Sequence, residues 1–228
     1  MEFLFDTADI GLISQYREMF AYTGVTTNPA LIRKAGVVDH TFAHFQEIRS
    51  IIGFERTLHM QVVSHQADEM IREAQMMLEK VDSQICIKVP VTPEGMKAIR
   101  TLKEQGVRVT ATAVVTQMQA LLALAMDVDY IAPYYDQMCD IGIDGQELIG
   151  MLADTIRQEG RSTKILAANI KNMAQLRQVC AAGSQAVTLN PRLLEESLRM
   201  PQIEKAIRLF DDAWREIHGD AGLCDLAD

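Results

Sequence analysis

The chain has 228 residues, 48% hydrophobic and 23% charged, which is the balance of a globular protein with a substantial core. Its formal net charge of −9 argues against binding to nucleic acid or to anionic membrane surfaces. We expect neither a signal peptide nor a membrane span, because the first residues lack a basic stretch and charges interrupt every apolar run.

Short β-rich runs alternate with longer helical patterns along the whole chain. The β-rich runs predict strands at Phe3–Asp6, Gly24–Thr27, Leu58–Val63, Ile85–Val89, Val109–Ala113, Tyr130–Pro133, Lys164–Ala168 and Ala186–Leu189. Helical segments between them include Gln66–Lys80, Pro93–Gln105, Thr116–Met126, Gly145–Gln158 and Asn172–Ala182. Because strict alternation requires parallel strands joined by right-handed crossovers, eight such units predict a (β/α)8 TIM barrel. A doubly wound sheet is the alternative, but no glycine-rich dinucleotide loop follows the first strand.

The predicted barrel occupies residues 1–200 and is followed by one additional helix. Residues 201–218 carry apolar side chains at helical spacing, among them Ile203, Ile207 and Phe210. We expect this C-terminal helix to pack on the barrel or on a neighbouring subunit. Residues 219–228 are acidic and are expected to form a flexible tail.

Lys88 lies inside the apolar run Ile85–Val91, which predicts a buried strand closed by Pro90. Burying an ammonium costs several kcal/mol, so a lysine in such a place needs a partner or a function. A lowered pKa leaves the amine neutral and able to attack a carbonyl. This is the chemistry of a Schiff-base enzyme.

Polar side chains stand at the C-terminal ends of the other predicted strands, where TIM barrels carry their chemistry. They are Asp6, Thr26, Thr27, Asn28, Gln61, Thr112, Tyr134 and Asn169. One such residue alone is structural as readily as functional. Their convergence around a buried lysine predicts an active site.

The four cysteines, Cys86, Cys139, Cys180 and Cys224, are far apart and show no metal-type spacing. Unpaired cysteines in a domain of this size are typical of a reducing compartment. We therefore expect a cytoplasmic protein.

Six stretches resemble the transaldolase superfamily, and within it the small fructose-6-phosphate aldolase subfamily. They are LFDTAD (Leu4–Asp9), GVTTNPALI (Gly24–Ile32), IKVPVTPEGMKAI (Ile87–Ile99), TAVVTQMQALLA (Thr112–Ala123), YIAPY (Tyr130–Tyr134) and LAANIK (Leu166–Lys171). The resemblance extends over nearly the whole chain. Small transaldolases typically carry glutamate and phenylalanine where this chain has Gln61 and Tyr134, so the resemblance favours an aldolase.

The resemblance implies a class I, Schiff-base aldolase that reversibly joins dihydroxyacetone or hydroxyacetone to an aldehyde acceptor. Lys88 would form the iminium with the ketone, and Asp6 would assist proton transfers at the reacting carbon. Gln61, Thr112 and Tyr134 would position a proton-relaying water. No metal or other cofactor is implied, because the iminium withdraws electrons as a metal would.

Asn28 would hold donor hydroxyls, with Thr27 beside it in the same motif. The resemblance also implies a homo-oligomer, either a pentamer or a decamer. It implies that the binding partner of the site is a small sugar or hydroxyketone. We expect no nucleic-acid or membrane partner. Two other functions stay open: a transaldolase-type dihydroxyacetone transferase and a non-catalytic sugar-binding barrel.

The sequence departs from the family pattern at the acceptor end of the site. Family members place an arginine and a serine where this chain has Gln137 and Asn169, and both hold the acceptor's phosphate. Losing a guanidinium removes a bidentate hold on phosphate, so we expect an acceptor without phosphate. Lys171 or Arg192 could compensate, since barrels favour phosphate sites after strands seven and eight.

Overall fold

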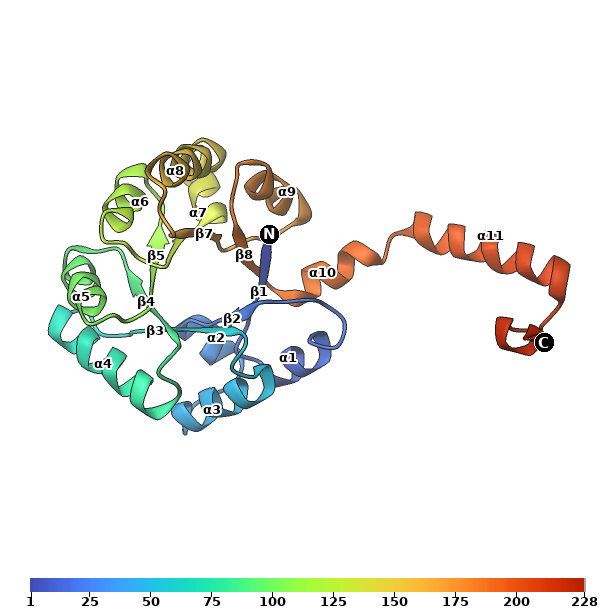
Figure 1. Ribbon diagram of the computed structural model, residues 1–228, viewed down its shortest axis with the longest axis horizontal. Coiled ribbons are helices and arrows are strands. Elements are labelled where there is room, and N and C mark those ends of the chain that lie inside the picture. Colours follow the sequence, from blue (N-terminus) through green and yellow to red (C-terminus); the bar gives the residue numbers. More distant parts are fainter. Residues whose placement is uncertain (228) are drawn as a thin grey trace. The chain divides into compact units, whose positions relative to one another are not determined.

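Eight parallel strands close into a barrel in chain order, from β1 to β8, in this computed structural model of residues 1–227 (Figure 1). The strands are β1 (Glu2–Asp6), β2 (Gly24–Thr26), β3 (Thr57–Gln61), β4 (Cys86–Pro90), β5 (Val109–Val114), β6 (Tyr130–Pro133), β7 (Lys164–Ala167) and β8 (Ala186–Leu189). Each overlaps one predicted strand, and the TIM barrel prediction is confirmed. The doubly wound alternative fails because β1 pairs with β8 as well as with β2.

Helices surround the barrel and connect its strands (Figure 1). They are α1 (Ile10–Tyr16), α2 (Pro29–Lys34), α3 (Thr41–Ile52), α4 (Ala67–Lys80), α5 (Pro93–Glu104), α6 (Gln117–Leu124), α7 (Tyr135–Asp140), α8 (Gly145–Glu159) and α9 (Met173–Ala181). Local sequence sets where they start. Thr92 caps α5 by accepting from the Gly95 amide at 3.0 Å, and Thr116 with Gln119 forms a capping box on α6.

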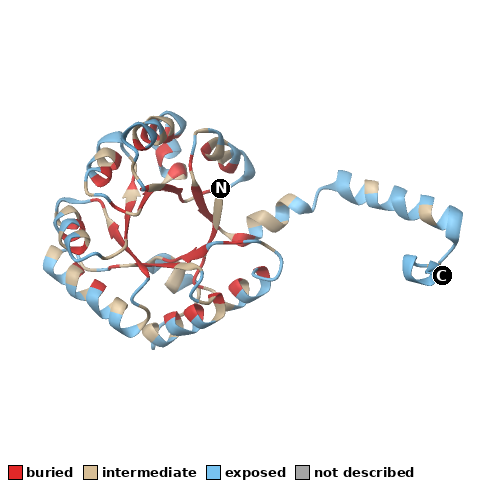
Figure 2. Cartoon of the chain, viewed as in Figure 1, coloured by how far each residue is buried: buried red, intermediate tan, exposed pale blue. Residues whose placement is uncertain are grey.

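The strands form the most buried part of the barrel, and the helices bury the faces that pack on them (Figure 2). Strands buried on both faces need continuous apolar runs, which explains sequences such as Val109–Val114. One buried cluster consists of Leu4, Cys86, Tyr130, Leu166 and Ala186. These side chains fill the region that would otherwise be an open channel.

His59 is fully buried on β3 and has both ring nitrogens occupied by hydroxyl groups. Nδ1 lies 2.8 Å from the Thr110 hydroxyl and Nε2 lies 3.0 Å from that of Thr57. Burial lowers the pKa of His59 well below its ordinary value, and the nearby Lys88 adds to this effect. The imidazole is therefore neutral and structural.

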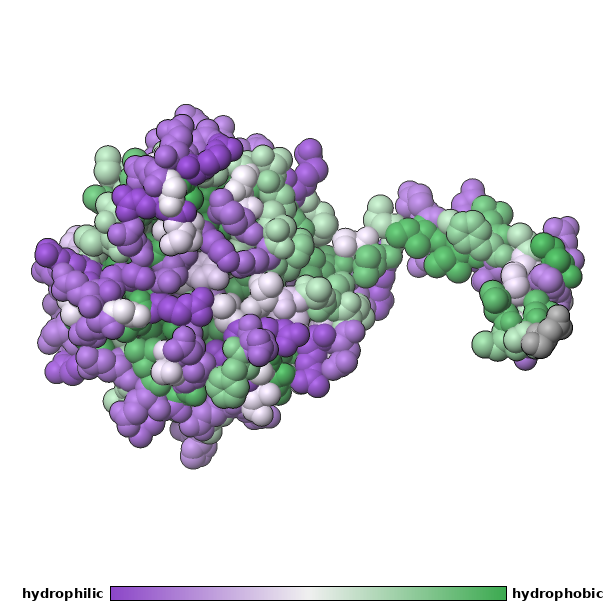
Figure 3. Space-filling model, viewed as in Figure 1, coloured by the Kyte–Doolittle hydropathy of each residue, from purple (hydrophilic) through white to green (hydrophobic). Residues whose placement is uncertain are grey.

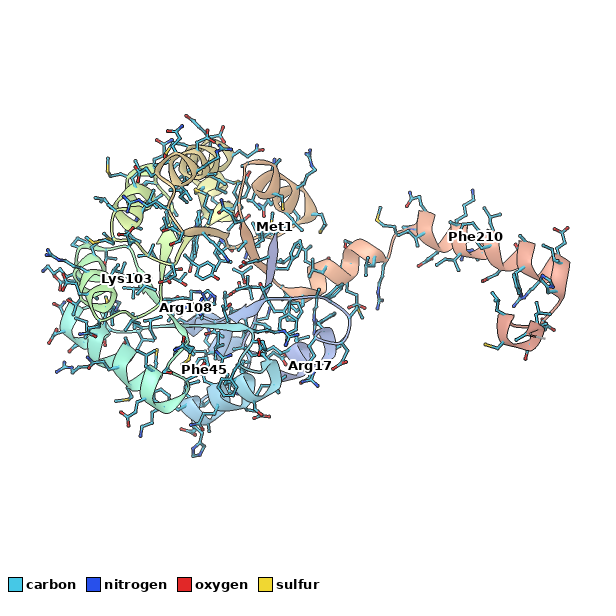
Figure 4. The ribbon with its side chains drawn as sticks, in the orientation of Figure 1. Met1, Arg17, Phe45, Lys103, Arg108 and Phe210 are labelled. Atoms are coloured by element: carbon cyan, nitrogen blue, oxygen red, sulfur yellow. The ribbon has the colours of Figure 1, made fainter. Side chains whose placement is uncertain are left out.

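Charges are paired where the strands begin. Lys103 Nζ lies 2.7 Å from Asp129, which also accepts from the Val109 amide at 2.8 Å, and Lys164 pairs with Glu2. Figure 4 labels Lys103 with Arg108, the residue before β5.

A more deeply buried pair lies at the same end. Arg49, in the last turn of α3, pairs with Asp82 at 3.1 Å, and their side chains are 4% and 7% exposed. Nη1 of Arg49 also donates to the carbonyls of Gly53 and Arg56, both at 2.8 Å. These contacts tie α3 to the segment that precedes β4.

A second compact unit begins at Arg192, after the unit Met1–Pro191. It contains most of α10 (Pro191–Leu198), then α11 (Pro201–His218) and the 3₁₀ helix η1 (Leu223–Leu226). The predicted C-terminal helix has the range of α11, and what it packs against stays a prediction. Within this unit Trp214 Nε1 donates to the Ala221 carbonyl at 2.7 Å. Asp228, the last residue of the predicted tail, lies outside the described residues.

The helix α11 is strongly amphipathic. Its apolar residues Ile207, Phe210 and Ile217 are 51%, 71% and 74% exposed, and apolar surface follows the helix in Figure 3. None of the helices in residues 1–227 combines the length and the apolar character needed to cross a membrane.

Candidate active site

A pocket of about 810 Å³ contains most of the predicted site residues. The predicted residues that line it are Asp6, Asn28, Gln61, Lys88, Tyr134, Gln137, Asn169 and Lys171. They come from the C-terminal ends of strands and the segments that follow, as expected for a TIM barrel. Thr27 and Thr112 lie next to this set without lining the pocket. The volume is ample for a sugar-sized ligand.

Lys88 is 4% exposed, and its amine makes one hydrogen bond, to the Thr27 carbonyl at 2.8 Å. No carboxylate in residues 1–227 forms an ion pair with it. Burial lowers the pKa of Lys88 from its ordinary value, and the more distant charge of Asp6 opposes this only in part. A larger fraction of the amine is therefore neutral and nucleophilic than in a solvated lysine.

Asp6 ends β1 and is held by two hydroxyls in series. Thr26 Oγ1 donates to Asp6 Oδ1 at 2.6 Å, and Thr188 Oγ1 lies 2.6 Å from Thr26 Oγ1. Because a threonine hydroxyl has one proton, Thr188 must donate to Thr26 while Thr26 donates to the carboxylate. The chain Asp6–Thr26–Thr188 leaves the other carboxylate oxygen for a substrate.

Tyr134 follows β6 and accepts a hydrogen bond from Thr112. The Thr112 hydroxyl lies 3.1 Å from the phenol oxygen, so the phenol proton is available for another acceptor. Burial raises the pKa of Tyr134, and the Thr112 hydrogen bond lowers it by less. The side chain is therefore a proton donor at neutral pH.

The strand that carries Thr112 is irregular. Between Ala111 and Val114 the pairing of β5 with β6 shifts register, and Ala113 adopts φ 58°. A left-handed conformation is unfavourable for alanine, and bulges of this kind often redirect side chains beside active sites. The irregularity directly follows the residue that contacts Tyr134.

Gln61 ends β3, in register with Lys88 on β4. Its side-chain oxygen is buried and has no hydrogen-bond partner within residues 1–227. An unpaired buried acceptor costs about 1–3 kcal/mol, so a donor from a substrate or a water would be held firmly there. This acceptor is suited to positioning a water, the role expected of Gln61 from the sequence.

The two asparagines occupy special backbone positions. Asn28 caps α2 by accepting from the Leu31 amide at 3.0 Å, which leaves its NH₂ group as a donor. Asn169 adopts φ 59°, a left-handed conformation that asparagine tolerates better than most residues. Gln137 lines the same pocket from α7.

Thr27 contacts Lys88 through its backbone rather than its side chain. The Thr27 hydroxyl donates to the His59 carbonyl at 2.9 Å, while the Thr27 carbonyl accepts from Lys88. Thr27 therefore fixes the position of the amine. Its predicted contact with substrate stays a prediction.

Three residues of the site and its surroundings were not predicted from the sequence. Thr188 is polar in the apolar strand Ala186–Leu189, a signal that could have been read. Arg33 and Lys34 line the pocket from α2 but lie on a helix too short for a periodic pattern. Arg192 belongs to the second unit and is not among the lining residues.

Comparison with known proteins identifies the family of the chain. Residues 3–221 match the family described as Transaldolase/Fructose-6-phosphate aldolase. A probable fructose-6-phosphate aldolase of Streptococcus pneumoniae is 38% identical over 214 residues, which cover 94% of this chain and 96% of that protein. A probable transaldolase of Geobacillus thermodenitrificans is 35% identical, over 94% of this chain and 98% of the relative. The Bacillus cereus protein named probable transaldolase 1 is 32% identical, with coverages of 95% and 98%. The chain therefore belongs to the transaldolase/fructose-6-phosphate aldolase family.

Proposed function

We propose that the protein is a class I aldolase that joins a small hydroxyketone, such as dihydroxyacetone or hydroxyacetone, to an aldehyde acceptor and reverses this reaction. The observation that carries the proposal is the environment of Lys88. Its amine is buried, lacks a carboxylate partner among the described residues and opens onto the pocket. A structural lysine would be paired or solvated, whereas a Schiff-base lysine needs this environment.

The reaction would begin with attack of the neutral Lys88 amine on the ketone carbonyl. A carbinolamine forms, and loss of water leaves a protonated iminium. Removal of a proton from the neighbouring carbon then gives an enamine, because the iminium accepts the electron pair. The enamine carbon attacks the acceptor aldehyde, a carbon–carbon bond forms, and the new alkoxide takes a proton. Water finally hydrolyses the product iminium and frees Lys88.

Proton transfers would be divided between two sides of the pocket. Asp6, which is fixed by Thr26, would contact the hydroxyl on the reacting carbon. Tyr134 and Gln61 supply a donor and an acceptor that together can hold a water. A phenol whose pKa is raised cannot act alone as a base at neutral pH, so a relay through that water is the consistent route.

An aldolase is favoured over a transferase by Tyr134 and Gln61, which replace the phenylalanine and glutamate of typical small transaldolases. A polar pair around a water favours hydrolysis of the donor iminium and release of the free ketone. The names of the relatives include both activities, so the test must separate them.

Borohydride trapping tests the proposal. The protein is incubated with dihydroxyacetone and sodium borohydride, digested and analysed by mass spectrometry, with Lys88→Met as the control. We expect a reduced three-carbon adduct on the peptide that contains Lys88. If Lys88 stays unmodified, both enzyme functions are excluded and the non-catalytic sugar-binding barrel is the remaining hypothesis. Free dihydroxyacetone released from a ketose without an acceptor identifies the aldolase, and its retention until an acceptor arrives identifies the transferase.

Two accompanying proposals concern where and how the protein acts. The four cysteines are free thiols, which supports the cytoplasm as its location. The exposed apolar residues of α11 support a homo-oligomer. Native mass spectrometry of the full chain would report the number of subunits, with a stable monomer contradicting the second proposal.

A further inference from the structure

The Asp6 carboxylate is held by hydroxyls from the two strands that flank β1. The register places Asp6 beside Thr26 of β2, and it places Leu4 beside Thr188 of β8. Because side chains recur on one face of a strand every second residue, Leu4 and Asp6 point to the same side of β1. Leu4 belongs to the buried cluster inside the barrel. The Thr188 hydroxyl therefore meets Thr26 inside the barrel, below the carboxylate that lines the pocket.

Burial gives this hydroxyl chain a fixed direction. Thr26 is 0% exposed and Thr188 is 2% exposed, so solvent is not a partner for either hydroxyl. Among the described residues, the Thr188 hydroxyl has Thr26 Oγ1 as its only hydrogen-bond partner, at 2.6 Å. Reversing the chain would leave the Thr188 proton buried without an acceptor, which is unfavourable. Thr26 therefore receives a proton from Thr188 and gives its own to Asp6.

This direction makes the two oxygens of Asp6 unequal. Oδ1 accepts from Thr26 at 2.6 Å, whereas Oδ2 has no hydrogen bond within residues 1–227. A proton on Oδ1 would face the proton that Thr26 already directs at it. A proton that Asp6 takes up is therefore confined to Oδ2, the oxygen that remains available to a substrate.

We propose that Thr188 is a positioning residue that keeps the exchangeable proton of Asp6 on Oδ2. This inference rests on the proposed aldolase function and adds to it a residue that does not touch the substrate. In cleavage, Oδ2 takes the proton of the substrate hydroxyl while the carbon–carbon bond breaks, and the electron pair of that bond passes to the iminium to form the enamine. In addition, Oδ2 returns the proton to the new alkoxide.

Removing the Thr188 hydroxyl should affect one step of the reaction and spare another. Hydrogen bonds in series strengthen one another, so Thr26 without its donor becomes a weaker donor to Asp6. Thr26 is then also free to accept, and the proton of Asp6 can settle on Oδ1, away from the substrate. Lys88 lies outside the chain, because its amine donates to the Thr27 carbonyl. Iminium formation should therefore continue while proton transfer through Asp6 slows.

Two full-length variants and one control separate the hydroxyl from the space it fills. Thr188→Val replaces the hydroxyl with a methyl group of similar size, and Thr188→Ser keeps the hydroxyl. The control is Thr163→Val. The Thr163 side chain is also buried, and its hydroxyl donates to the Val128 carbonyl at 2.7 Å without lining the pocket. Urea unfolding gives the folded fraction of each variant, and all rates are expressed per folded molecule.

The kinetic test uses dihydroxyacetone as donor and the faster of glyceraldehyde and glyceraldehyde 3-phosphate as acceptor. We expect Thr188→Val to lower kcat about tenfold and to change KM less than about twofold. Its solvent isotope effect on kcat should rise, because proton transfer becomes rate-limiting, while borohydride trapping of Lys88 keeps its rate. Thr188→Ser should recover most of kcat, and Thr163→Val should keep all of it.

Three kinetic outcomes would overturn the inference. The first is an unchanged kcat in Thr188→Val. The second is an equal loss in Thr163→Val, which would assign the effect to general destabilisation. The third is an equal loss in Thr188→Ser, which would assign it to packing. In each case a normal Lys88 adduct would leave the aldolase intact.

A spectroscopic measurement tests the hydroxyl chain whether or not Lys88 reacts. The protein is labelled with ¹³C-carboxyl aspartate, and the Asp6 resonance is identified by its loss in Asp6→Asn. We expect this resonance to move in Thr188→Val and to stay in place in Thr163→Val, because only the first weakens a hydrogen bond to the carboxylate. An unmoved resonance would overturn the inference. A moved resonance without any Lys88 adduct would support the hydroxyl chain and overturn only the aldolase.

Discussion

The two ends of the barrel use charged residues in opposite ways. Where the strands begin, Arg49 pairs with Asp82, Lys103 with Asp129 and Lys164 with Glu2. Where the strands end, Lys88 has a carbonyl as its partner, and the pocket residues Arg33 and Lys34 have no acidic partner among the described residues. Charges at the first end hold helices and strands together. At the second end the missing partners leave groups available to a substrate.

Arg49 and Lys88 make the comparison concrete, because both are buried cations. Burial lowers the pKa of each from its ordinary value. Arg49 stays charged, since a guanidinium starts from a very high pKa and has Asp82 beside it. Lys88 has neither protection, so the same burial favours the neutral form of its amine, as the proposed chemistry requires.

Replacing Lys88 should have the largest effect on activity. Lys88→Met removes the nucleophile, and we expect kcat/KM to fall by about 10⁴-fold or more, with no borohydride adduct. The free energy of unfolding should not decrease, because an apolar side chain suits the buried position. Lys97→Met, on the exposed surface of α5, is the control and should keep full activity. A retained adduct in Lys88→Met would show that another amine reacts.

Replacing Asp82 should have the largest effect on stability. Asp82→Asn leaves Arg49 charged and buried without its counter-ion, which should lower the free energy of unfolding by about 3–5 kcal/mol. Urea denaturation measures this. The exposed pair is the control: Glu104→Gln should change stability by less than about 1 kcal/mol. If folded Asp82→Asn protein lost a large part of its kcat/KM, then the two ends of the barrel would not have separate roles.

Replacing Tyr134 should lower the activity and change the stability of the fold very little. Tyr134→Phe removes the phenol that Thr112 orients, and we expect kcat/KM to fall by about 10²-fold with little change in urea midpoint. The neighbouring Tyr135→Phe is the matched control, because that phenol donates to Gln178 instead. Equal activity losses in the two variants would remove Tyr134 from the mechanism.

The smallest expected effect is the pH dependence that Lys88 gives to the free energy of unfolding. It is also the most direct test of the buried amine. Its pKa lies below the ordinary 10.5, so the folded chain binds fewer protons than the unfolded chain between the two values. The free energy of unfolding should therefore rise with pH across that window, by at most about 1.4 kcal/mol per unit for one proton. Lys88→Met should abolish the rise, and the rate of borohydride trapping should increase through the same lowered pKa. A trapping rate that follows a pKa of 10.5 would contradict a buried, reactive amine.

Much of this arrangement could be predicted from the sequence because it depends on local patterns. The strand around Lys88 is an uninterrupted apolar run, and strand-end polar residues such as Asp6 and Gln61 meet at one face of a closed barrel. The start of α5 follows from Thr92 and Pro93 alone.

Other features depend on contacts between distant residues and could not be predicted. Thr188 meets Thr26 across 162 positions of sequence, and only barrel closure brings them together. The hydroxyl of Thr27 donates to the carbonyl of His59, which lies 32 positions away in the sequence. Arg33 and Lys34 reach the pocket only because the six-residue α2 is inserted between β2 and α3.

The hydroxyl chain from Asp6 through Thr26 to Thr188 crosses the seam where the first and last strands meet. The Asp6 carboxylate is therefore oriented, through Thr26, by a residue that the ribosome adds 182 positions later. A nascent or truncated chain that lacks β8 would hold Lys88 and Asp6 without this fixed geometry. The proposed activity should therefore depend on closure of the ring, and recovery of activity during refolding would then report on that closure.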